Sequence, residues 1–480
     1  MGLAKRAAKG LFWVALSTIF VRAVGFIAKI ILARLLAPED FGLLAIGLLT
    51  INTVGIFKDL GLGAALIHRK ENIKEAADTA FLIIPIFAIT LFGLAFFSAP
   101  FVATFFENSQ ATAIIRVLAF TLVISSFATV PSNLLEKELE FKKKIVPEAL
   151  PQLGYAIVAI TLAILGYGVW SLVWGQVVSA LIGAILIWFF VDWRPKLCFD
   201  KSATKEMLSY GKEIIAASFI IFLHSNLDDA LVGKLLGVVT LGYYSLAYTI
   251  SIMPATSISC LIHRVTFPAY SKIQDDKERL GEAYLKVLKL VGTLSMPVAI
   301  GIFLIAPNFV PTIFGAKWGS SIPILQILCF LGILKSINST TGSIFGGVGK
   351  PEYSKKTSLI NFIIFATLVY PLIIRLKLIG VGLAVVISYS IGTIYGLSIT
   401  CKIIGKNFST MLNTLRHSIL GTLLMAICVF ALNLTLQSFN ISSLFRLFAD
   451  IGIGILFYSG YILIFDKTSF EYFRGLFKEN

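Results

Sequence analysis

One short stretch of this sequence places ionisable and amide side chains inside an otherwise apolar segment. His224, Asn226, Asp228 and Asp229 fall within six residues, in a run from 214 to 236 that is long enough to cross a bilayer as a helix. A charged side chain near mid-membrane costs about 2.5–3.5 kcal/mol on insertion scales, so these residues need a physical reason. Two interpretations stay open: a polar knot that ties this helix to its neighbours, and a site that binds a coupling cation.

The spacing of these residues defines two pairs. His224 and Asp228 are four residues apart and share one face of a helix, and Asn226 and Asp229 are three apart. A carboxylate moved into a low dielectric tends to take up a proton or a sodium ion, because desolvation disfavours the bare anion. Another carboxylate, Asp59, lies in a second apolar run. We expect the cation-coupling residues to be His224, Asn226, Asp228, Asp229 and Asp59.

Basic side chains also occur inside apolar runs, and they favour an anionic substrate. Five of them outnumber the three membrane acids Asp59, Asp228 and Asp229, so a cavity that they line would attract an anion. The alternative for residues near a helix end is that they snorkel to the headgroups. The predicted substrate-binding residues are Arg22, Lys29, Lys58, Arg116 and Lys335.

The position of each basic residue on its helix affects whether it can face a cavity. Arg22 and Lys29 are seven residues apart and share a face. Lys29 and Arg116 are close enough to a helix end for snorkelling to compete equally with a cavity role. Lys58 and Asp59 are adjacent, so their side chains do not face one another.

The elements that must position these residues are membrane-spanning helices. The chain of 480 residues is 57% hydrophobic and only 14% charged, whereas soluble domains carry about 25% charged residues. We predict an all-α polytopic membrane protein with about fourteen transmembrane helices. The candidate spans are 10–36, 41–67, 78–106, 111–135, 146–165, 168–191, 213–236, 241–268, 284–306, 321–347, 357–375, 378–401, 415–437 and 445–465.

The distribution of basic residues predicts the orientation in the membrane. Most of the 41 lysines and arginines fall in alternate connections, starting with the N-terminal segment. Because cytoplasmic loops carry the excess of lysine and arginine, both termini are expected to be cytoplasmic. The net charge of +15 is then explained by topology, and no nucleic-acid partner is expected. No cleavable signal peptide is expected, since the first apolar run is too long.

The chain resembles itself at an offset of 200 residues. Segment 33–36 (ARLL) returns as 233–236 (GKLL), and 41–43 (FGL) returns as 241–243 (LGY). Both copies would start on the same side, which predicts two six-helix lobes related by a parallel repeat about an axis along the membrane normal. The predicted division is 1–200 for the first lobe, 201–405 for the second, and 406–480 for two additional helices and a cytoplasmic tail.

Other chemistries find little support in the sequence. The five cysteines are scattered without the spacing of a metal site or disulfide framework. The segment 346–350 (GGVGK) lacks the spacing of a phosphate-binding loop, so ATP hydrolysis is not expected. We expect no cofactor, no metal and no enzymatic activity. Tyr243, Tyr244 and Tyr248 are interpreted as part of an interfacial aromatic belt.

Several motifs in order resemble Wzx-type polysaccharide exporters. They are segments 33–36 (ARLL), 41–44 (FGLL), 59–63 (DLGLG), 67–71 (IHRKE), 134–141 (LLEKELEF), 237–248 (GVVTLGYYSLAY) and 264–276 (RVTFPAYSKIQDD). The chain is most similar to the branch that includes the colanic acid and teichuronic acid exporters. The motifs cover about the first 350 residues, and the remainder agrees in topology only.

The resemblance carries implications for fold and substrate. It implies the multidrug/oligosaccharidyl-lipid/polysaccharide exporter fold, with two lobes around a central cavity, alternating access, and two extra helices near a lipid groove. The implied substrate is an oligosaccharide linked to undecaprenyl diphosphate, moved from the inner to the outer leaflet of the bacterial cytoplasmic membrane. Membrane lipid, a proton or sodium ion, and a polysaccharide polymerase are the other implied partners. The exported product would be a lipopolysaccharide, capsule or exopolysaccharide.

A drug/cation antiporter of the same superfamily is the alternative function. That function predicts a cavity dominated by acidic and aromatic residues, whereas the membrane interior of this chain is net basic. An enzyme is a more distant alternative, because the short outer connections leave no room for a large external catalytic loop.

Overall fold

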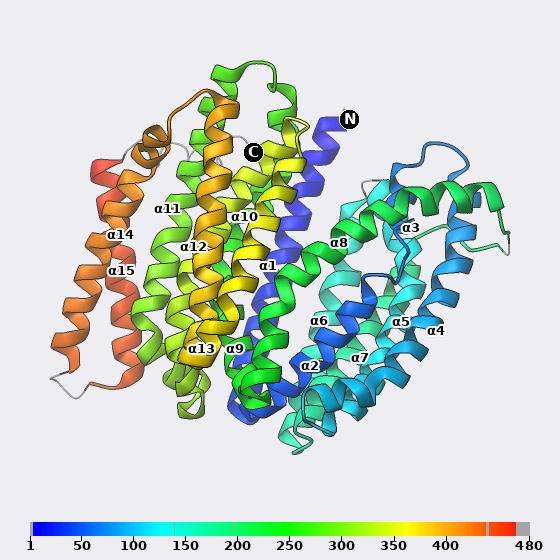
Figure 1. Cartoon of the computed structure of the whole chain (residues 1–480), viewed down its shortest axis with the longest axis horizontal. Coiled ribbons are helices and arrows are strands. Elements are labelled where there is room, and N and C mark those ends of the chain that lie inside the picture. The colour runs from blue at the N-terminus through cyan, green and yellow to red at the C-terminus, as the bar shows by residue number, and fades with distance from the viewer. Residues whose placement is uncertain (1–2, 139, 197, 438–440, 467–480) are drawn as a thin grey trace. The chain divides into compact units, whose positions relative to one another are not determined.

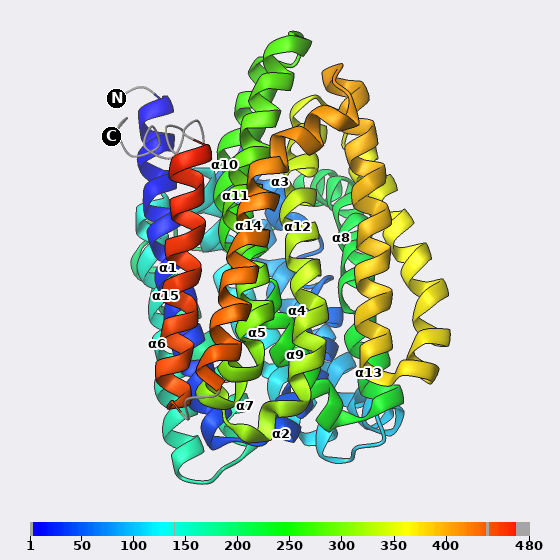
Figure 2. The same ribbon diagram turned by 90° about the vertical axis from the view of Figure 1, so that its left-hand side faces the viewer.

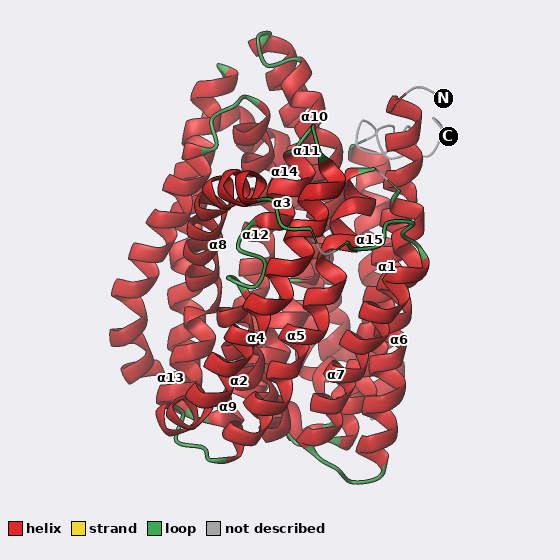
Figure 3. Cartoon of the chain, turned by 90° about the vertical axis from the view of Figure 1, so that its right-hand side faces the viewer, coloured by secondary structure: helices red, strands yellow, loops and turns green. Residues whose placement is uncertain are grey.

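The computed structural model of the chain describes residues 3–138, 140–196, 198–437 and 441–466. Within these ranges every regular element is a helix and no strand occurs (Figure 3), which confirms the predicted all-α class. Nine helices in the described ranges are long and apolar enough to cross a membrane. The polytopic membrane fold is therefore confirmed, while the count of fourteen spans stays a prediction.

The chain divides into two compact units, one ending at Gly242 and the other starting at Tyr243. The predicted lobes 1–200 and 201–405 and the appendix 406–480 differ from this division and stay a prediction. Both units are bundles of helices (Figure 1).

The first unit holds eight helices, and α8 bends along its length (Figure 1). They are α1 (Leu3–Leu35), α2 (Pro38–Gly55), α3 (Leu62–His68), α4 (Ile73–Phe105), α5 (Gln110–Lys137), α6 (Phe141–Ile164), α7 (Val169–Leu186) and α8 (Lys201–Leu236). Helix α8 begins at Lys201, before the expected span 213–236. The later part of the expected connection 192–212 is therefore helical and belongs to α8.

The second unit is formed by the remaining helices. They are α9 (Val238–Ser251), which begins in the first unit, α10 (Met253–Lys272), α11 (Lys277–Phe309), α12 (Ile322–Gly347), α13 (Glu352–Ile404), α14 (Phe408–Gln437) and α15 (Ser443–Phe465). Helix α13 is two helices joined at a kink, because Lys377 has non-helical dihedrals. The kink separates the two spans that were expected at 357–375 and 378–401.

The expected span 41–67 is broken rather than continuous. Helix α2 ends at Gly55 and α3 begins at Leu62, with Leu60 and Gly61 at positive φ values of 52° and 70°. Asp59 stabilises the turn, since its Oδ1 accepts a hydrogen bond from the Gly61 backbone N–H at 3.0 Å. Glycine tolerates this backbone region and aspartate favours such turns, which explains the break.

The expected span 241–268 is also interrupted, in the corresponding region of the second half. Helix α9 ends at Ser251 and α10 begins at Met253, followed directly by Pro254. Proline lacks the backbone N–H that would continue the helix, so it is well placed in the first turn of a new one.

The repeat inferred from the sequence has a structural counterpart at the starts of α2 and α9. A Cβ atom on Gly42 would lie 1.9 Å from the carbonyl oxygen of Val238, and one on Gly242 would lie 1.9 Å from that of Pro38. Gly42 corresponds to Gly242, and Pro38 to Val238, at the same offset of 200. The Val238 carbonyl oxygen thus lies against Gly42, and the Pro38 carbonyl oxygen lies against Gly242. The same close backbone contact occurs twice, and each helix supplies the glycine once and the carbonyl oxygen once.

Apolar side chains fill the bundle interior and also cover much of its surface. In the first unit, Leu62, Leu66 and Ile84 are fully buried in a cluster of α3, α4 and α5. Phe101 on α4 and Leu456 on α15 are 78% and 67% exposed. Large exposed apolar residues on long helices fit a lipid environment rather than water.

Candidate functional site

The acidic stretch on α8 lies within the first unit. Asp228 is the most buried of its polar residues, with 5% of its surface exposed, while His224, Asn226 and Asp229 are half-buried. The amide nitrogen of Asn226 donates to the carbonyl oxygen of Phe222 at 2.9 Å, so this donor is used one turn back within α8 itself. The described part of the chain holds no group of three or more metal-ligating side chains.

Asp59 and Lys58 occupy the break between α2 and α3 and have different partners. Asp59 accepts from the Gly61 N–H, whereas the Lys58 ammonium donates to Ser125 Oγ of α5 at 3.2 Å. Lys58 also lines a pocket of about 380 Å³ together with Asn52 and Thr121. These contacts agree with the expectation that adjacent residues do not face one another.

The break is fitted tightly against α8, the helix that carries Asp228. A Cβ atom on Gly211 of α8 would lie 2.1 Å from the carbonyl oxygen of Leu60, and one on Gly61 would lie 2.4 Å from the Gly211 Cα. Two glycines therefore allow the backbone of the break to touch α8 directly. Both predicted acidic sites belong to this packed pair of elements.

The basic residues of α1 lie along the side that approaches α6. Arg22 and Lys29 are half-buried and share a face with Gly25. A Cβ atom on Gly25 would lie 3.1 Å from the amide nitrogen of Gln152 in α6. Ser17 precedes Arg22 on α1, and its hydroxyl donates to Glu148 Oε2 of α6 at 3.3 Å.

Arg116 is held by the neighbouring helix α4. Its Nε donates to the carbonyl oxygen of Phe96 at 3.3 Å, and its guanidinium carbon lies 4.6 Å from the centre of the Phe96 ring. Contacts of this kind anchor a cation within an aromatic and backbone environment. Its predicted role in substrate binding stays a prediction.

Lys335 of α12, in the second unit, lies between two tyrosines. Its ammonium donates to the Tyr248 hydroxyl at 2.6 Å and lies 4.9 Å and 5.2 Å from the ring centres of Tyr248 and Tyr389. These contacts orient the ammonium against two aromatic rings. Tyr244 is fully buried, and the interpretation of these tyrosines as part of an aromatic belt stays a prediction.

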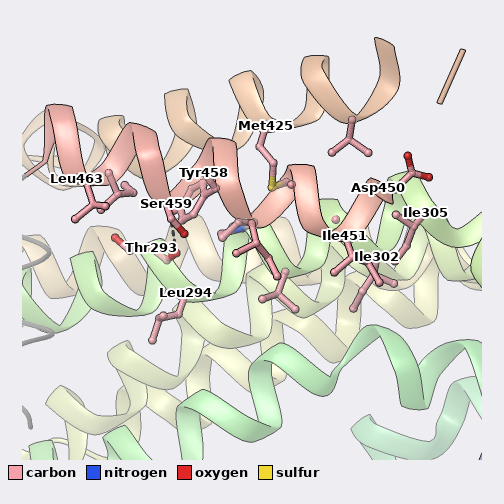
Figure 4. A pocket seen from close by; sticks show the side chains of 17 residues that line it. Thr293, Leu294, Ile302, Ile305, Met425, Asp450, Ile451, Tyr458, Ser459 and Leu463 are labelled. Carbon is pink, nitrogen blue, oxygen red and sulfur yellow. Dashed lines mark hydrogen bonds between the residues drawn. The ribbon is translucent and has the colours of Figure 1, made fainter. Parts of the chain in front are cut away.

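An apolar groove lies between α11, α14 and α15 (Figure 4), next to the two additional helices near which the resemblance implies a lipid groove. These three helices lie side by side (Figure 2). The groove encloses about 620 Å³, and its lining is almost entirely apolar. We call it the α11–α15 groove; its lining includes Pro297, Val298, Ile302, Val429, Ile451 and Ile455.

Polar groups mark the two ends of the α11–α15 groove. At one end Asp450, which is 1% exposed, accepts a hydrogen bond from the Asn433 amide at 3.1 Å. Toward the other end the Tyr458 hydroxyl donates to the carbonyl oxygen of Thr293 at 2.7 Å. Asp450 lies inside the expected span 445–465, so the sequence count of three membrane acids was too low. The excess of basic over acidic groups is correspondingly smaller.

A family of polysaccharide biosynthesis proteins matches residues 31–323 of the chain. The lipopolysaccharide biosynthesis protein WzxC of Escherichia coli is 29% identical over 371 residues, which cover 76% of this chain and 75% of WzxC. The teichuronic acid biosynthesis protein TuaB of Bacillus subtilis is 26% identical over 464 residues, 95% of either chain.

Solved structures with the same fold are transporters. The lipid II flippase MurJ in an inward closed conformation aligns with a TM-score of 0.75 at 17% identity, over 94% of this chain and 98% of MurJ. An inward-facing multidrug resistance transporter of the MATE family aligns with a TM-score of 0.65 at 20% identity, over 82% of this chain and 95% of the transporter. At these identities the likeness concerns the fold alone. The sequence matches place this chain in the family of polysaccharide biosynthesis proteins, among the Wzx-type exporters.

Proposed function

We propose that the chain flips an oligosaccharide linked to undecaprenyl diphosphate from the inner to the outer leaflet of the bacterial cytoplasmic membrane. The single observation that carries the proposal is the α11–α15 groove. A transporter for a lipid-linked sugar needs an apolar place for a tail that never leaves the bilayer. A groove of about 620 Å³ lined by aliphatic side chains on membrane helices meets that need.

The anionic diphosphate requires cations inside the protein. We propose Arg22, Lys29, Lys58, Arg116 and Lys335 as the residues that attract it, with Arg22 and Lys335 contributing most. The ammonium of Lys335 is positioned by the Tyr248 hydroxyl and the Tyr389 ring. Arginine offers a planar fork that suits phosphate oxygens.

We further propose that Asp228 and Asp59 couple transport to a cation gradient, with His224, Asn226 and Asp229 in supporting roles. A buried carboxylate is stabilised by a proton or a sodium ion when the site is closed, and it ionises when water enters. The cation can bias the conformational equilibrium only through unequal affinity for the two states. Such coupling makes transport by alternating access independent of ATP.

Flipping of a lipid-linked oligosaccharide in proteoliposomes tests this function. We expect wild-type protein to move the labelled lipid across the bilayer, faster with an imposed proton or sodium gradient than without one. Arg22→Ala and Lys335→Ala are each expected to reduce the rate at least tenfold, whereas Arg375→Ala, an exposed arginine on α13, serves as the control. Proteoliposomes in which the wild type moves no lipid-linked sugar would refute the proposal.

A further inference from the structure

A second, polar pocket adjoins the α11–α15 groove at the end marked by Thr293. It encloses about 710 Å³, and its polar lining consists of Lys289, Thr410, Asn413, Thr414, Arg416, His417 and Asp466. Lys289 lies one helical turn before Thr293 on α11. Ile464 and Asp466 follow Leu463 of the groove on α15. The same three helices thus line an apolar groove and, directly next to it, a pocket that contains cationic side chains.

Two lining residues of this pocket, Lys289 and Asp466, form an ion pair with one another. The Lys289 ammonium lies 2.6 Å from Asp466 Oδ1, and the two side chains are 16% and 3% exposed. The pair fixes the end of α15 against α11. A carboxylate that is already paired with a lysine repels an incoming anion less than a bare carboxylate would.

Arg416 supplies a positive charge at the wall of the pocket. Its Nε donates to His417 Nε2 at 3.2 Å, and His417 Nδ1 lies 3.4 Å from the Tyr461 hydroxyl. Within the described ranges Arg416 makes no ion pair with a carboxylate. The Arg416 side chain is therefore oriented by a histidine rather than by a carboxylate.

We propose that this pocket binds the diphosphate of an isoprenoid carrier lipid while the lipid tail lies in the α11–α15 groove. The inference rests on the proposed function, because it assigns part of the same substrate to a second place on the protein. An amphiphile with an anionic head and a long apolar tail matches a cationic pocket that lies next to an apolar groove. A free phosphate compound would leave the groove unused, and an uncharged lipid would leave Arg416 unused.

The predicted orientation gives this pocket a role in loading. The start of α14 and the end of α15 are expected on the cytoplasmic side, so the pocket would lie at the headgroup level of the inner leaflet. The lipid-linked sugar is assembled on that side under the proposed function. The pocket would hold the substrate before it reaches Arg22 and Lys335, which are proposed for transport itself.

Photocrosslinking from the groove tests the proposal at the site itself. The full chain with Ile455→benzoylphenylalanine is placed in nanodiscs and exposed to radiolabelled undecaprenyl diphosphate or undecaprenol. We expect the diphosphate lipid to crosslink at concentrations about tenfold lower than the alcohol, since a charge-assisted hydrogen bond contributes roughly that factor. Arg416→Gln should remove this difference. Arg375→Gln, the same change at an exposed arginine of α13, should preserve it.

Three outcomes would overturn the proposal. They are equal crosslinking of the two lipids, full phosphate-dependent crosslinking in Arg416→Gln with an unfolding midpoint like the wild type, and equal competition by phosphatidylglycerol. The last result would identify the occupant as a bulk anionic lipid. Failure of the flipping assay with phosphate-dependent crosslinking intact would count against the proposed function alone. Normal flipping by a wild type whose crosslinking ignores phosphate would count against the pocket alone.

Discussion

Replacing the glycines at the starts of α2 and α9 is expected to force these helices apart. A Cβ atom in Gly42→Ala would lie 1.9 Å from the Val238 carbonyl oxygen, and one in Gly242→Ala 1.9 Å from that of Pro38. Carbon and carbonyl oxygen normally approach to about 3.3 Å, so the helices must separate by roughly 1.4 Å. The obstacle is backbone in both cases, and no side-chain rotation can relieve it.

The magnitude follows from two opposing contributions. Overpacking of this kind costs about 3 kcal/mol, at the upper end of its usual range, because only a helix shift can relieve it. Alanine in place of a helical glycine returns up to about 1 kcal/mol. We therefore expect each single substitution to lower the free energy of unfolding by about 2 kcal/mol. For a unit of this size that corresponds to a drop of about 4–8 °C in the unfolding midpoint.

The reciprocal geometry makes a sharper prediction for the double variant. If Gly42→Ala has already separated the helices, Gly242→Ala meets a gap that the first substitution opened. The double variant should therefore lose less than the sum of the two single losses, about 3 rather than about 4 kcal/mol. Thermal unfolding in one detergent measures all four proteins.

Gly93→Ala in α4 is the matched control. Nothing lies within 4 Å of a Cβ atom at this position, so the same change should leave the midpoint unchanged or raise it. Single variants as stable as Gly93→Ala would refute the close contact. Strict additivity of the two losses would show that the contacts are not shared.

The remaining predictions concern charged residues in the first unit. Asp228→Asn should abolish the dependence of flipping on a cation gradient, and Asp229→Asn should do less, because only Asp228 is fully buried; equal effects would contradict this. Arg22→Lys should retain part of the transport rate that Arg22→Ala loses, since the charge survives without the guanidinium fork. The hydrogen bond and charge of Lys234, 2.7 Å away, lower the pKa of Glu107 below its ordinary 4.5. The interaction of Glu107 with Lys234 therefore stabilises the fold above pH 4.5, and this stabilisation is lost as the pH falls through the lowered pKa of Glu107. The difference in unfolding midpoint between wild type and Glu107→Gln should shrink from pH 7 to pH 3.

The helical segments could be predicted because lipid imposes a length and a composition on each of them. The breaks at Leu60–Gly61 and after Ser251 were harder to predict, since an apolar run looks the same whether its backbone is continuous or turned. The residues that cause the first break, Asp59 and Gly61, were visible in the sequence. Their charge and their family motif point to function, and neither marks the turn that they form.

Tertiary contacts account for most of what the sequence did not predict. The position of Tyr248 next to Lys335 depends on the packing of α9 against α12, which no spacing within one helix encodes. The α11–α15 groove is formed by the consecutive helices α14 and α15 together with α11, which precedes them by two helices. The resemblance implied a groove near the two additional helices, but no local pattern marks α11 as its third wall. Asp450 is different: it lies inside an expected span, and a full count of membrane acids would have found it.

The reciprocal glycine contact also constrains how a repeat protein of this kind can move. Gly42 meets Val238 and Gly242 meets Pro38, so exchanging the two repeats maps the contact onto itself. A sliding motion at this point would break both halves of the contact at once, because each carbonyl oxygen is fitted to a glycine without a side chain. The two glycines therefore hold the starts of α2 and α9 in one register at this contact.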